Sequence, residues 1–304
     1  MSQLPAVSPT RSLGTSGIVV SSMAWGMWRF QGDDVSAARA LVEAALDSGV
    51  TLFDTADIYG ADTPGGFGSS EVLLGKVFAQ TPSLRDKIVL ATKGGIVPGL
   101  PYDSSPAYLE AAIDASLRRL STERIDLWQI HRPDILTHPR DMALAMAKAH
   151  QAGKVAAFGV SNHTLAQTRS LAALAPEGVA VCATQPELSP LCLEAIEDGT
   201  LDHAMAKNLA VLAWSPLGGG RLANPGTTRE QAVAAALDAV AEPAGVSRTA
   251  AAFSWIMAHP ARPIPIVGSQ RASRIRESAD AYKVRWSRAE WYTVLVASRG
   301  TPLP

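Results

Sequence analysis

The chain has 304 residues, of which 47% are hydrophobic and 18% are charged, a composition typical of a folded protein with a large core. Its 27 basic and 28 acidic residues give a formal net charge of −1, which excludes the basic field of a nucleic-acid-binding protein and the basic stripe of a membrane-surface helix. Cys182 and Cys192 form no Cys-x-x-Cys pair, no apolar run reaches the ~20 residues of a membrane span, and no signal segment precedes the first predicted element. We therefore expect a cytoplasmic protein that binds neither nucleic acid nor membrane.

The predicted elements alternate between strands and helices. Residues 1–20 predict a short hairpin. Eight apolar runs then predict strands, at 21–27, 51–57, 87–95, 124–131, 154–162, 179–188, 209–218 and 262–269. Amphipathic stretches rich in alanine and leucine predict helices between them, at 34–48, 69–79, 106–120, 137–151, 164–174, 198–207 and 271–280. Further helices are predicted at 230–241, 247–258 and 287–298.

The repeat of strand and helix predicts a parallel sheet with helices outside it, and eight such units favour a closed (β/α)8 TIM barrel. An open doubly wound sheet is the alternative, but the glycine fingerprint expected after its first strand is missing. The segment Gly65-Gly66-Phe67-Gly68 lacks the G-x-G-x-x-G spacing, and Gly75-Lys76 does not end a phosphate loop, because positions 70 and 77 are serine and valine. We expect one α/β domain over residues 1–304, with the hairpin capping the barrel bottom and additional C-terminal helices.

Polar residues end several of the predicted strands, where the chemistry of a parallel barrel is located. The second predicted strand ends in Asp54-Thr55-Ala56-Asp57, with Tyr59 just beyond it. The third ends in Thr92-Lys93-Gly94, and the fourth ends in His131-Arg132-Pro133-Asp134. Each residue alone is as easily a surface or barrel-mouth residue, and Asp57 is an alternative carboxylate that caps the next segment. Their coincidence on three neighbouring strands predicts a functional site.

The residue types at this site suit acid–base chemistry. A tyrosine hydroxyl has an ordinary pKa near ~10 and is a poor acid–base group at neutral pH. An ammonium at Lys93 would lower the pKa of Tyr59, and Asp54 would keep Lys93 charged and fixed. His131 would hydrogen-bond a substrate oxygen or relay a proton. Such a set suits protonation of a developing alkoxide, and the sequence contains no metal-ligand cluster and no activated serine or cysteine nucleophile.

At these residues the sequence resembles the aldo-keto reductase family. The resemblance runs from about residue 11 to about residue 298, and the matching segments are DTADIYG (54–60), GSSEVLLGK (68–76), ATKGG (91–95), IDLWQIHRPD (125–134), FGVSN (158–162), TQPELSP (184–190), WSPLGGGRL (214–222) and IVGSQ with Arg274 (266–274). Eight motifs in the right order are a specific signal. The resemblance implies a TIM barrel and an NADPH-dependent oxidoreductase that reduces aldehydes or ketones to alcohols.

The resemblance also implies roles for the matching residues. Tyr59 matches the proton donor and Lys93 the partner that lowers its pKa. Asp54 matches the carboxylate paired with that lysine, and His131 the histidine that orients the substrate. Ser161, Asn162 and Gln185 match residues that bind the nicotinamide carboxamide, and Trp214 stands where the family usually has a tyrosine or phenylalanine ring that stacks on the nicotinamide. Positions matching the ribose and pyrophosphate contacts are Gly26, Met27, Asp54, Ser215, Pro216, Leu217, Gly218, Gly220 and Arg221.

Cofactor choice is expected to depend on the last strand and the helix that follows it. Ser269 and Arg274 match the positions that hold the adenosine 2′-phosphate, which favours a helix N-terminus together with an arginine. Gln270 and Ser278 match neighbouring adenine-side positions. Gly268 departs from the family pattern, because many members have a lysine there. We expect NADPH ahead of NADH, with a solvated helix residue as the alternative interpretation of Arg274.

Substrate specificity is expected from the loops after the first, fourth and seventh predicted strands and from the tail, Ser298 to Pro304. Trp28 and Phe30 are expected to wall the pocket, with Arg132 beside His131, and simple packing at the barrel rim is the alternative for these side chains. Two other functions of the same barrel are alternatives for this chain. One is a catalytically idle NADP-binding regulatory subunit. The other is a phosphate-sugar lyase or isomerase, which would lack Trp214 and the carboxamide-binding residues Ser161, Asn162 and Gln185. The expected partner is a small carbonyl substrate, and the expected state is a monomer, with weak oligomerisation as the alternative.

Overall fold

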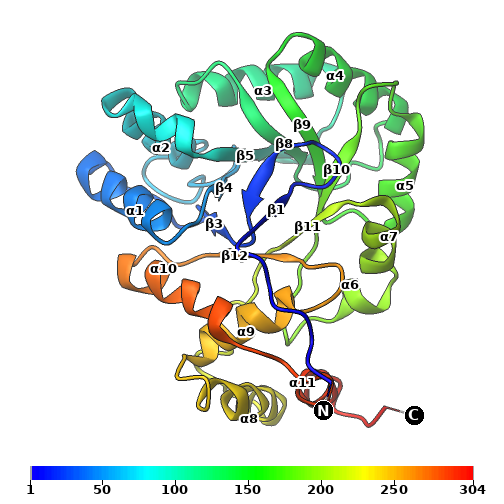
Figure 1. The fold of residues 1–304 in the computed structure, drawn as a ribbon. Helices are drawn as coiled ribbons and strands as arrows, with labels where there is room; N and C mark the ends of the chain where they lie inside the picture. The colour runs from blue at the N-terminus through cyan, green and yellow to red at the C-terminus, as the bar shows by residue number, and fades with distance from the viewer. Residues whose placement is uncertain (1, 304) are drawn as a thin grey trace.

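The structure, a computed structural model, describes residues 2–303. Eight parallel strands form a closed barrel at its centre (Figure 1). In spatial order these strands are β3 (Ala24–Gly26), β4 (Leu52–Asp54), β5 (Val89–Gly94), β8 (Ile125–Ile130), β9 (Val155–Ser161), β10 (Val181–Gln185), β11 (Ala210–Ala213) and β12 (Ile264–Val267). The predicted (β/α)8 TIM barrel is confirmed.

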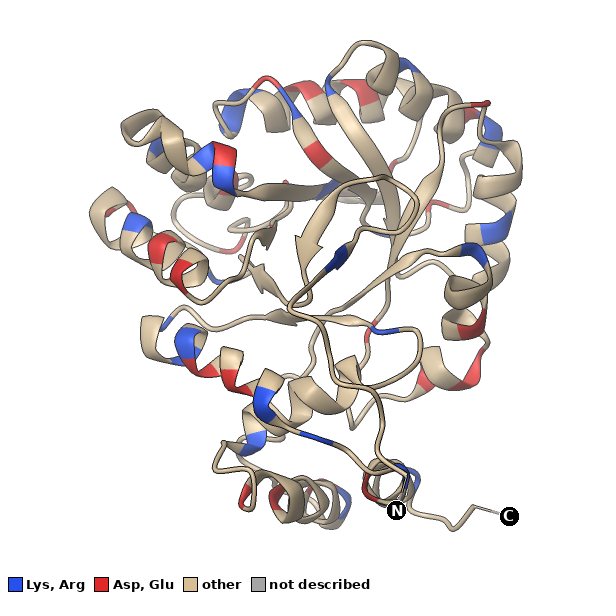
Figure 2. Cartoon of the chain, in the orientation of Figure 1, with Lys and Arg blue, Asp and Glu red and all other residues tan. Residues whose placement is uncertain are grey.

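Helices surround the barrel, and most of the charged residues lie on them and on the loops (Figures 1 and 2). Their bounds are α1 (Val35–Asp47), α2 (Ser69–Gln80), α3 (Pro106–Arg119), α4 (Pro139–Gln151), α5 (Leu165–Leu174), α6 (Glu194–Glu197), α7 (Thr200–Lys207), α8 (Thr228–Ala241), α9 (Arg248–Met257), α10 (Ala272–Ser278) and α11 (Arg288–Arg299), with 3₁₀ turns η1 (Pro82–Lys87) and η2 (Ala279–Lys283). Local sequence sets these starts. Asp34 accepts a hydrogen bond from the Ala37 amide before α1, and Thr227 with Glu230 forms a capping box at α8.

An antiparallel hairpin, β1 (Thr10–Ser12) and β2 (Val19–Ser21), precedes the barrel. It crosses the middle of the barrel in the view of Figure 1. Its turn packs closely on the lower ends of β10 and β11: a Cβ at Gly14, where φ is +56°, would lie 2.0 Å from the carbonyl oxygen of Cys182. Leu13 is fully buried in the barrel interior. The hairpin therefore closes the end of the barrel opposite the carboxyl ends of the strands, as predicted.

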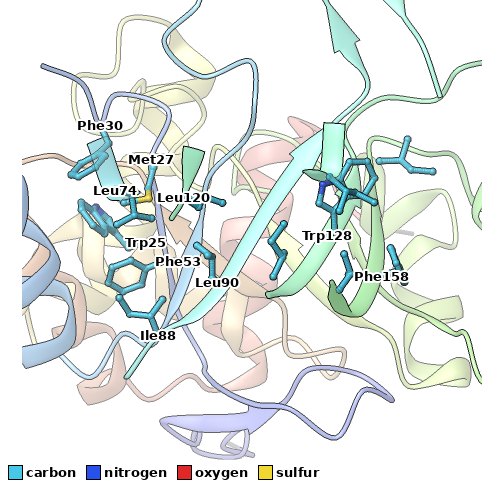
Figure 3. Packing of buried hydrophobic residues seen from close by; sticks show 14 of the residues in the cluster. Trp25, Met27, Phe30, Phe53, Leu74, Ile88, Leu90, Leu120, Trp128 and Phe158 are labelled. Atoms are coloured by element: carbon cyan, nitrogen blue, oxygen red, sulfur yellow. The ribbon is translucent and has the colours of Figure 1, made fainter. Parts of the chain in front are cut away.

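Apolar side chains fill both the barrel and the layer between strands and helices. The interior includes Leu52, Leu127 and Ile264, all fully buried. In the layer between strands and helices, the Trp25 ring of β3 meets the Phe53 ring of β4 edge-to-face, with ring centres 5.2 Å apart. Figure 3 shows these rings within the larger hydrophobic cluster. Because both faces of the strands are covered, their sequences are almost continuously apolar.

The additional C-terminal helices have a core of their own. The rings of Trp255 in α9 and Trp291 in α11 stack at 4.7 Å, and each indole N–H donates to the other residue's backbone carbonyl at 3.0 Å. Both side chains are buried, so this reciprocal pair fixes α11 against α9.

The structure also has elements that the sequence pattern did not predict. A second hairpin, β6 (Ile96–Val97) and β7 (Leu100–Tyr102), follows β5. The short helix α6 precedes α7. The predicted strand 51–57 is regular only over Leu52–Asp54, because the chain turns after it, with the Tyr59 amide donating to the Ala56 carbonyl at 3.2 Å.

Candidate active site

A cavity of about 530 Å³ opens at the carboxyl ends of the barrel strands. Seven of the eight barrel strands contribute to its wall, all except β5, either through a residue at the end of the strand or through the loop that follows it. The sequence-predicted site residues that line it are Gly26, Trp28, Asp54, Tyr59, His131, Arg132, Ser161, Asn162, Gln185, Trp214, Ser215, Pro216, Leu217, Gly220, Gly268 and Ser269. The fold thus brings residues from both ends of the chain to one place.

Asp54, at the end of β4, is the centre of a buried hydrogen-bond network at the cavity floor. The Lys93 ammonium donates to Asp54 Oδ2 at 2.6 Å and to the Thr55 carbonyl at 2.8 Å. Asp54 Oδ1 accepts from Gln185 Nε2 at 3.0 Å and from Gln129 Nε2 at 3.3 Å. Burial opposes the charge on Lys93, but attraction to Asp54 and Tyr59 outweighs it and raises the pKa of this lysine. Lys93 is therefore a fixed cation at neutral pH.

Tyr59 follows β4 and lies between this network and the cavity mouth. The Lys93 ammonium is 5.0 Å from the centre of the Tyr59 ring. The Trp28 ring meets Tyr59 edge-to-face at 5.1 Å, and the His131 ring does so at 5.8 Å. Burial raises the pKa of Tyr59, and this effect exceeds the lowering by Lys93. The lowering by Lys93 agrees with the expectation from the sequence, whereas the larger effect of burial was not predicted, because it is a property of the whole fold. Tyr59 is protonated at neutral pH.

His131, at the end of β8, is neutral in the same environment. Burial lowers its pKa well below the ordinary value, and the charges of Lys93 and Arg132 lower it further. Its Nδ1 atom is buried and has no hydrogen-bond partner within residues 2–303. Since an unpaired buried N–H is rarer than an unpaired acceptor, the neutral ring is expected to carry its proton on Nε2.

Three amide and hydroxyl side chains meet beside the Trp214 ring. Asn162 Nδ2 donates to Ser161 Oγ at 2.9 Å, and Trp214 Nε1 donates to Asn162 Oδ1 at 2.8 Å. Ser161 Oγ donates to the Gln185 backbone carbonyl at 3.0 Å. The side-chain oxygen of Gln185 receives no hydrogen bond from the described residues, so it is left as an acceptor on the cavity wall.

Backbone strain marks two positions of this wall. Asn162 and Ser215 have φ angles of 57° and 53°, in the left-handed region that non-glycine residues seldom adopt. They follow β9 and lie near the end of β11, respectively. Beyond Ser215, the loop continues with Gly219 and Gly220 at φ 71° and 93°, where an added Cβ would meet nothing within 4 Å. The loop therefore presents bare backbone to the cavity, and a flat or charged ligand can approach it closely.

Several predicted site residues do not line the cavity. The structure places the side chains of Met27 and Phe30 in the hydrophobic core, at 0% and 2% exposure, and Figure 3 shows both there. Phe30 is therefore not a wall of the pocket, in contrast to the prediction. Gly218 packs against Leu191, and Arg221 donates to the Gly218 carbonyl at 2.7 Å.

The residues predicted around the adenosine end are also engaged within the protein. Gln270 Nε2 donates to the Gly26 carbonyl at 3.0 Å. Ser278 is buried and donates to the Ile275 carbonyl at 2.6 Å, so its side chain faces the helix and not a ligand. The exposed Arg274 forms an ion pair with Glu277 at 3.3 Å.

The sequence reasoning also missed residues of the site. Gln129 joins the Asp54 network, and its signal was a polar residue, besides Asp126, inside the buried strand β8. Arg29, Gly219, Phe253 and Ile266 line the cavity; Phe253 and Ile266 gave no signal, because they look like ordinary core residues. Asp57, the alternative carboxylate, is not a helix cap: it is 1% exposed and accepts a hydrogen bond from the Tyr108 hydroxyl at 3.2 Å.

Residues 2–303 contain neither a metal-binding group of side chains nor a helix that could span a membrane. No group of three or more histidine, cysteine, aspartate or glutamate side chains is arranged to hold a metal ion within that range. Over the same described residues, no helix has the length and apolar character needed to cross a membrane.

The fold and the cavity define the class of protein. A parallel (β/α)8 barrel whose cavity joins a buried lysine–aspartate pair, a tyrosine and a histidine is the architecture expected from the resemblance in the sequence. The model of the Aldo/keto reductase family matches residues 22–295, and the chain belongs to this family of nicotinamide-dependent oxidoreductases.

Similar proteins include two reductases. A 6-dehydroglucose reductase from Novosphingobium aromaticivorans is 57% identical over 306 aligned residues, which cover 100% of both chains. A 6-dehydroglucose reductase from Agrobacterium fabrum is 35% identical and aligns with 92% of this chain and 95% of that protein. Among solved structures, the glycerol dehydrogenase of Gluconobacter oxydans has a TM-score of 0.83 at 27% identity, covering 97% of this chain and 98% of that one.

Proposed function

We propose that this protein reduces an aldehyde or ketone to an alcohol with NADPH, and that Tyr59 donates the proton. One observation carries the proposal: a buried, protonated tyrosine lies between a fixed ammonium and a neutral histidine, at the wall of a cavity that continues along a glycine loop. These groups suit delivery of a proton to a carbonyl oxygen.

The cavity fits a nicotinamide dinucleotide. The open backbone of Gly219 and Gly220 leaves room for a pyrophosphate. The free oxygen of Gln185 suits an N–H donor of the carboxamide, and the Trp214 ring, whose N–H is held by Asn162 Oδ1, offers a flat surface for the nicotinamide. When bound, the cofactor would supply the hydride that is transferred from C4 of its ring to the carbonyl carbon.

The chain's own residues would supply the proton and hold the carbonyl. The Lys93 ammonium has three N–H groups, of which Asp54 and the Thr55 carbonyl take two. The third remains available to stabilise the Tyr59 oxygen once its proton has left. His131, with Nε2–H toward the cavity, would donate to the same substrate oxygen. Tyr59 and His131 together would form the oxyanion site.

NADPH is proposed ahead of NADH because of the charge near the end of β12. Ser269 lines the cavity beside Gly268, and Arg274 lies in the first turn of α10, at a helix start suited to a phosphate. An incoming 2′-phosphate would compete with Glu277 for Arg274, since the existing pair is exposed and therefore weak.

For the substrate we propose the aldehyde of an oxidised sugar, with 6-dehydroglucose as the first candidate. The support is the 57% identity over the full chain to a 6-dehydroglucose reductase. The mouth of the cavity has room for a sugar beside the exposed Trp28 ring, and it carries arginines that suit its hydroxyl groups.

A parallel substrate screen tests this proposal. Purified protein is mixed separately with 6-dehydroglucose and with simple aldehydes, each over a range of aldehyde concentrations. Oxidation of NADPH and of NADH is followed by absorbance in parallel reactions. We expect turnover of aldehydes with NADPH preferred. NADPH binding without oxidation of any aldehyde would instead favour the idle regulatory subunit. The cytoplasmic location, the single domain and the monomeric state stay predictions from the sequence.

A further inference from the structure

Arg132 is a cation on the cavity wall with no hydrogen-bonding partner in the described part of the chain. It directly follows His131 after β8, lines the cavity and is partly buried. Neither a hydrogen bond from its guanidinium nor an ion pair with any carboxylate occurs within residues 2–303. Its guanidinium carbon lies over the Trp214 ring, 5.9 Å from the centre of the ring. A guanidinium has five N–H donors, and none of them is used within the described residues.

The charge of Arg132 is directed to the reacting end of the cavity. It lowers the pKa of both Tyr59 and His131, so it lies near the place where the carbonyl would bind. The glycine loop that suits the pyrophosphate, at Gly219 and Gly220, belongs to a different strand end. Arg132 is therefore placed to meet the substrate.

Among the residues that line the cavity, no carboxylate pairs with this positive charge; Glu187, outside that lining, is near enough for Arg132 to oppose the burial that raises the pKa of its carboxyl. Arg29 is a second lining arginine, and it likewise forms no ion pair within the described residues. The single acidic side chain among the lining residues of that range is Asp54, which the Lys93 ammonium already binds at 2.6 Å. A cavity of this kind favours a ligand rich in oxygen acceptors over a plain hydrocarbon chain.

We propose that Arg132 is the specificity-determining residue that binds an oxygen-rich group on the substrate, hydroxyl or acidic, next to the carbonyl carbon. The proposal rests on the proposed reductase function and gives its pocket a chemical selectivity. The Trp214 ring holds the guanidinium in place, and the fork of N–H groups then selects substrates with two neighbouring acceptors.

The test compares three aldehydes of equal chain length: propanal, glyceraldehyde and glyceraldehyde 3-phosphate. The variant Arg132→Met keeps the length of the side chain and removes its donors, and Arg132→Lys keeps the charge and removes the fork. Arg169→Met is the matched control, because Arg169 is an exposed arginine of α5 outside the cavity. For each protein, kcat/KM with NADPH is measured for all three aldehydes. The values for glyceraldehyde and for glyceraldehyde 3-phosphate are each divided by the value for propanal. NADPH affinity is measured by fluorescence titration.

We expect Arg132→Met to lower the ratio for at least one oxygen-rich aldehyde by about tenfold or more, mainly through KM, as for a lost hydrogen bond to a charged group. A larger loss for glyceraldehyde 3-phosphate would identify an acidic group as the ligand, and equal losses would identify the hydroxyls. Arg132→Lys should lower kcat/KM relative to propanal less for glyceraldehyde 3-phosphate than for glyceraldehyde. Ratios within twofold of the wild type, or an equal loss of NADPH affinity, would overturn the role of Arg132. If the wild type reduces none of the three aldehydes or 6-dehydroglucose, the proposed function itself fails.

Discussion

The Lys93 ammonium lies 2.6 Å from Asp54 Oδ2, and the two side chains are 0% and 3% exposed. A buried pair of this kind is held by its neighbours as much as by its own attraction, because both charges have lost their water. Here the glutamine amides of Gln129 and Gln185 and the Thr55 carbonyl complete the hydrogen bonding. The pair is thus a rigid support for Tyr59.

We predict that Lys93→Met lowers both stability and turnover. The substitution leaves the Asp54 carboxylate buried without its cation, which costs about 3–5 kcal/mol. It also removes the charge that stabilises the Tyr59 oxygen after proton transfer, so kcat should fall by about a hundredfold or more. Urea unfolding and steady-state rates with NADPH measure the two effects.

The double variant Asp54→Asn/Lys93→Met separates these effects. It removes both charges, so stability should recover part of the way toward the wild type while kcat stays low. Recovery of kcat together with stability would mean that Lys93 acts through folding alone.

The pH dependence of stability should depend on Asp57. Burial, and then the neighbouring charge of Glu71, raise the pKa of Asp57 from 3.8 to about 8, although Arg119 and the hydroxyl of Tyr108 oppose them. Between these values the native protein holds a proton that the unfolded chain releases. The stability from this proton is therefore fully present below about pH 4 and is lost as the pH rises to about 8, with a limiting slope of about 1.4 kcal/mol per pH unit.

Asp57→Asn should flatten that part of the curve. The measurement is the free energy of unfolding in urea at pH 5, 6, 7 and 8 for both proteins. As the pH rises, the free energy of unfolding of the variant should increase steadily relative to that of the wild type. Parallel curves would show that Asp57 titrates as an ordinary carboxyl.

Cofactor preference should depend on Arg274. Loss of a charge-assisted hydrogen bond to the 2′-phosphate predicts that Arg274→Met raises the KM for NADPH by about tenfold or more and leaves that for NADH nearly unchanged. Arg276→Met, an exposed arginine two residues further along α10, is the control. Equal changes for both cofactors would contradict a contact with the 2′-phosphate.

The sequence predicted the barrel because its strands are buried on both faces and its helices are amphipathic, and both patterns are local. It did not predict the hairpin β6–β7, whose Ile96–Tyr102 segment is too short and too rich in proline and glycine to show a period. It also made the strand at 51–57 too long, because Thr55-Ala56-Asp57 was taken as the end of the strand, whereas the chain turns after Asp54.

The site residues were predictable where they end a strand, as Asp54, Lys93 and His131 do. The prediction was weaker in loops, where side-chain direction follows no period. The sequence therefore predicted Phe30 as a wall of the pocket, whereas the structure places its side chain in the hydrophobic core. The sequence predicted that Lys93 lowers the pKa of Tyr59, but it did not predict the burial of the ring, a property of the whole fold that outweighs this lowering.

The most direct test of the central claim is Tyr59→Phe, which removes one oxygen from a buried ring and leaves the Lys93–Asp54 pair intact. NADPH affinity is measured by fluorescence titration, and single-turnover reduction of the best aldehyde is followed by NADPH absorbance. We predict that NADPH affinity stays nearly that of the wild type while reduction is abolished. Undiminished reduction by Tyr59→Phe would contradict the assignment of Tyr59 as the proton donor.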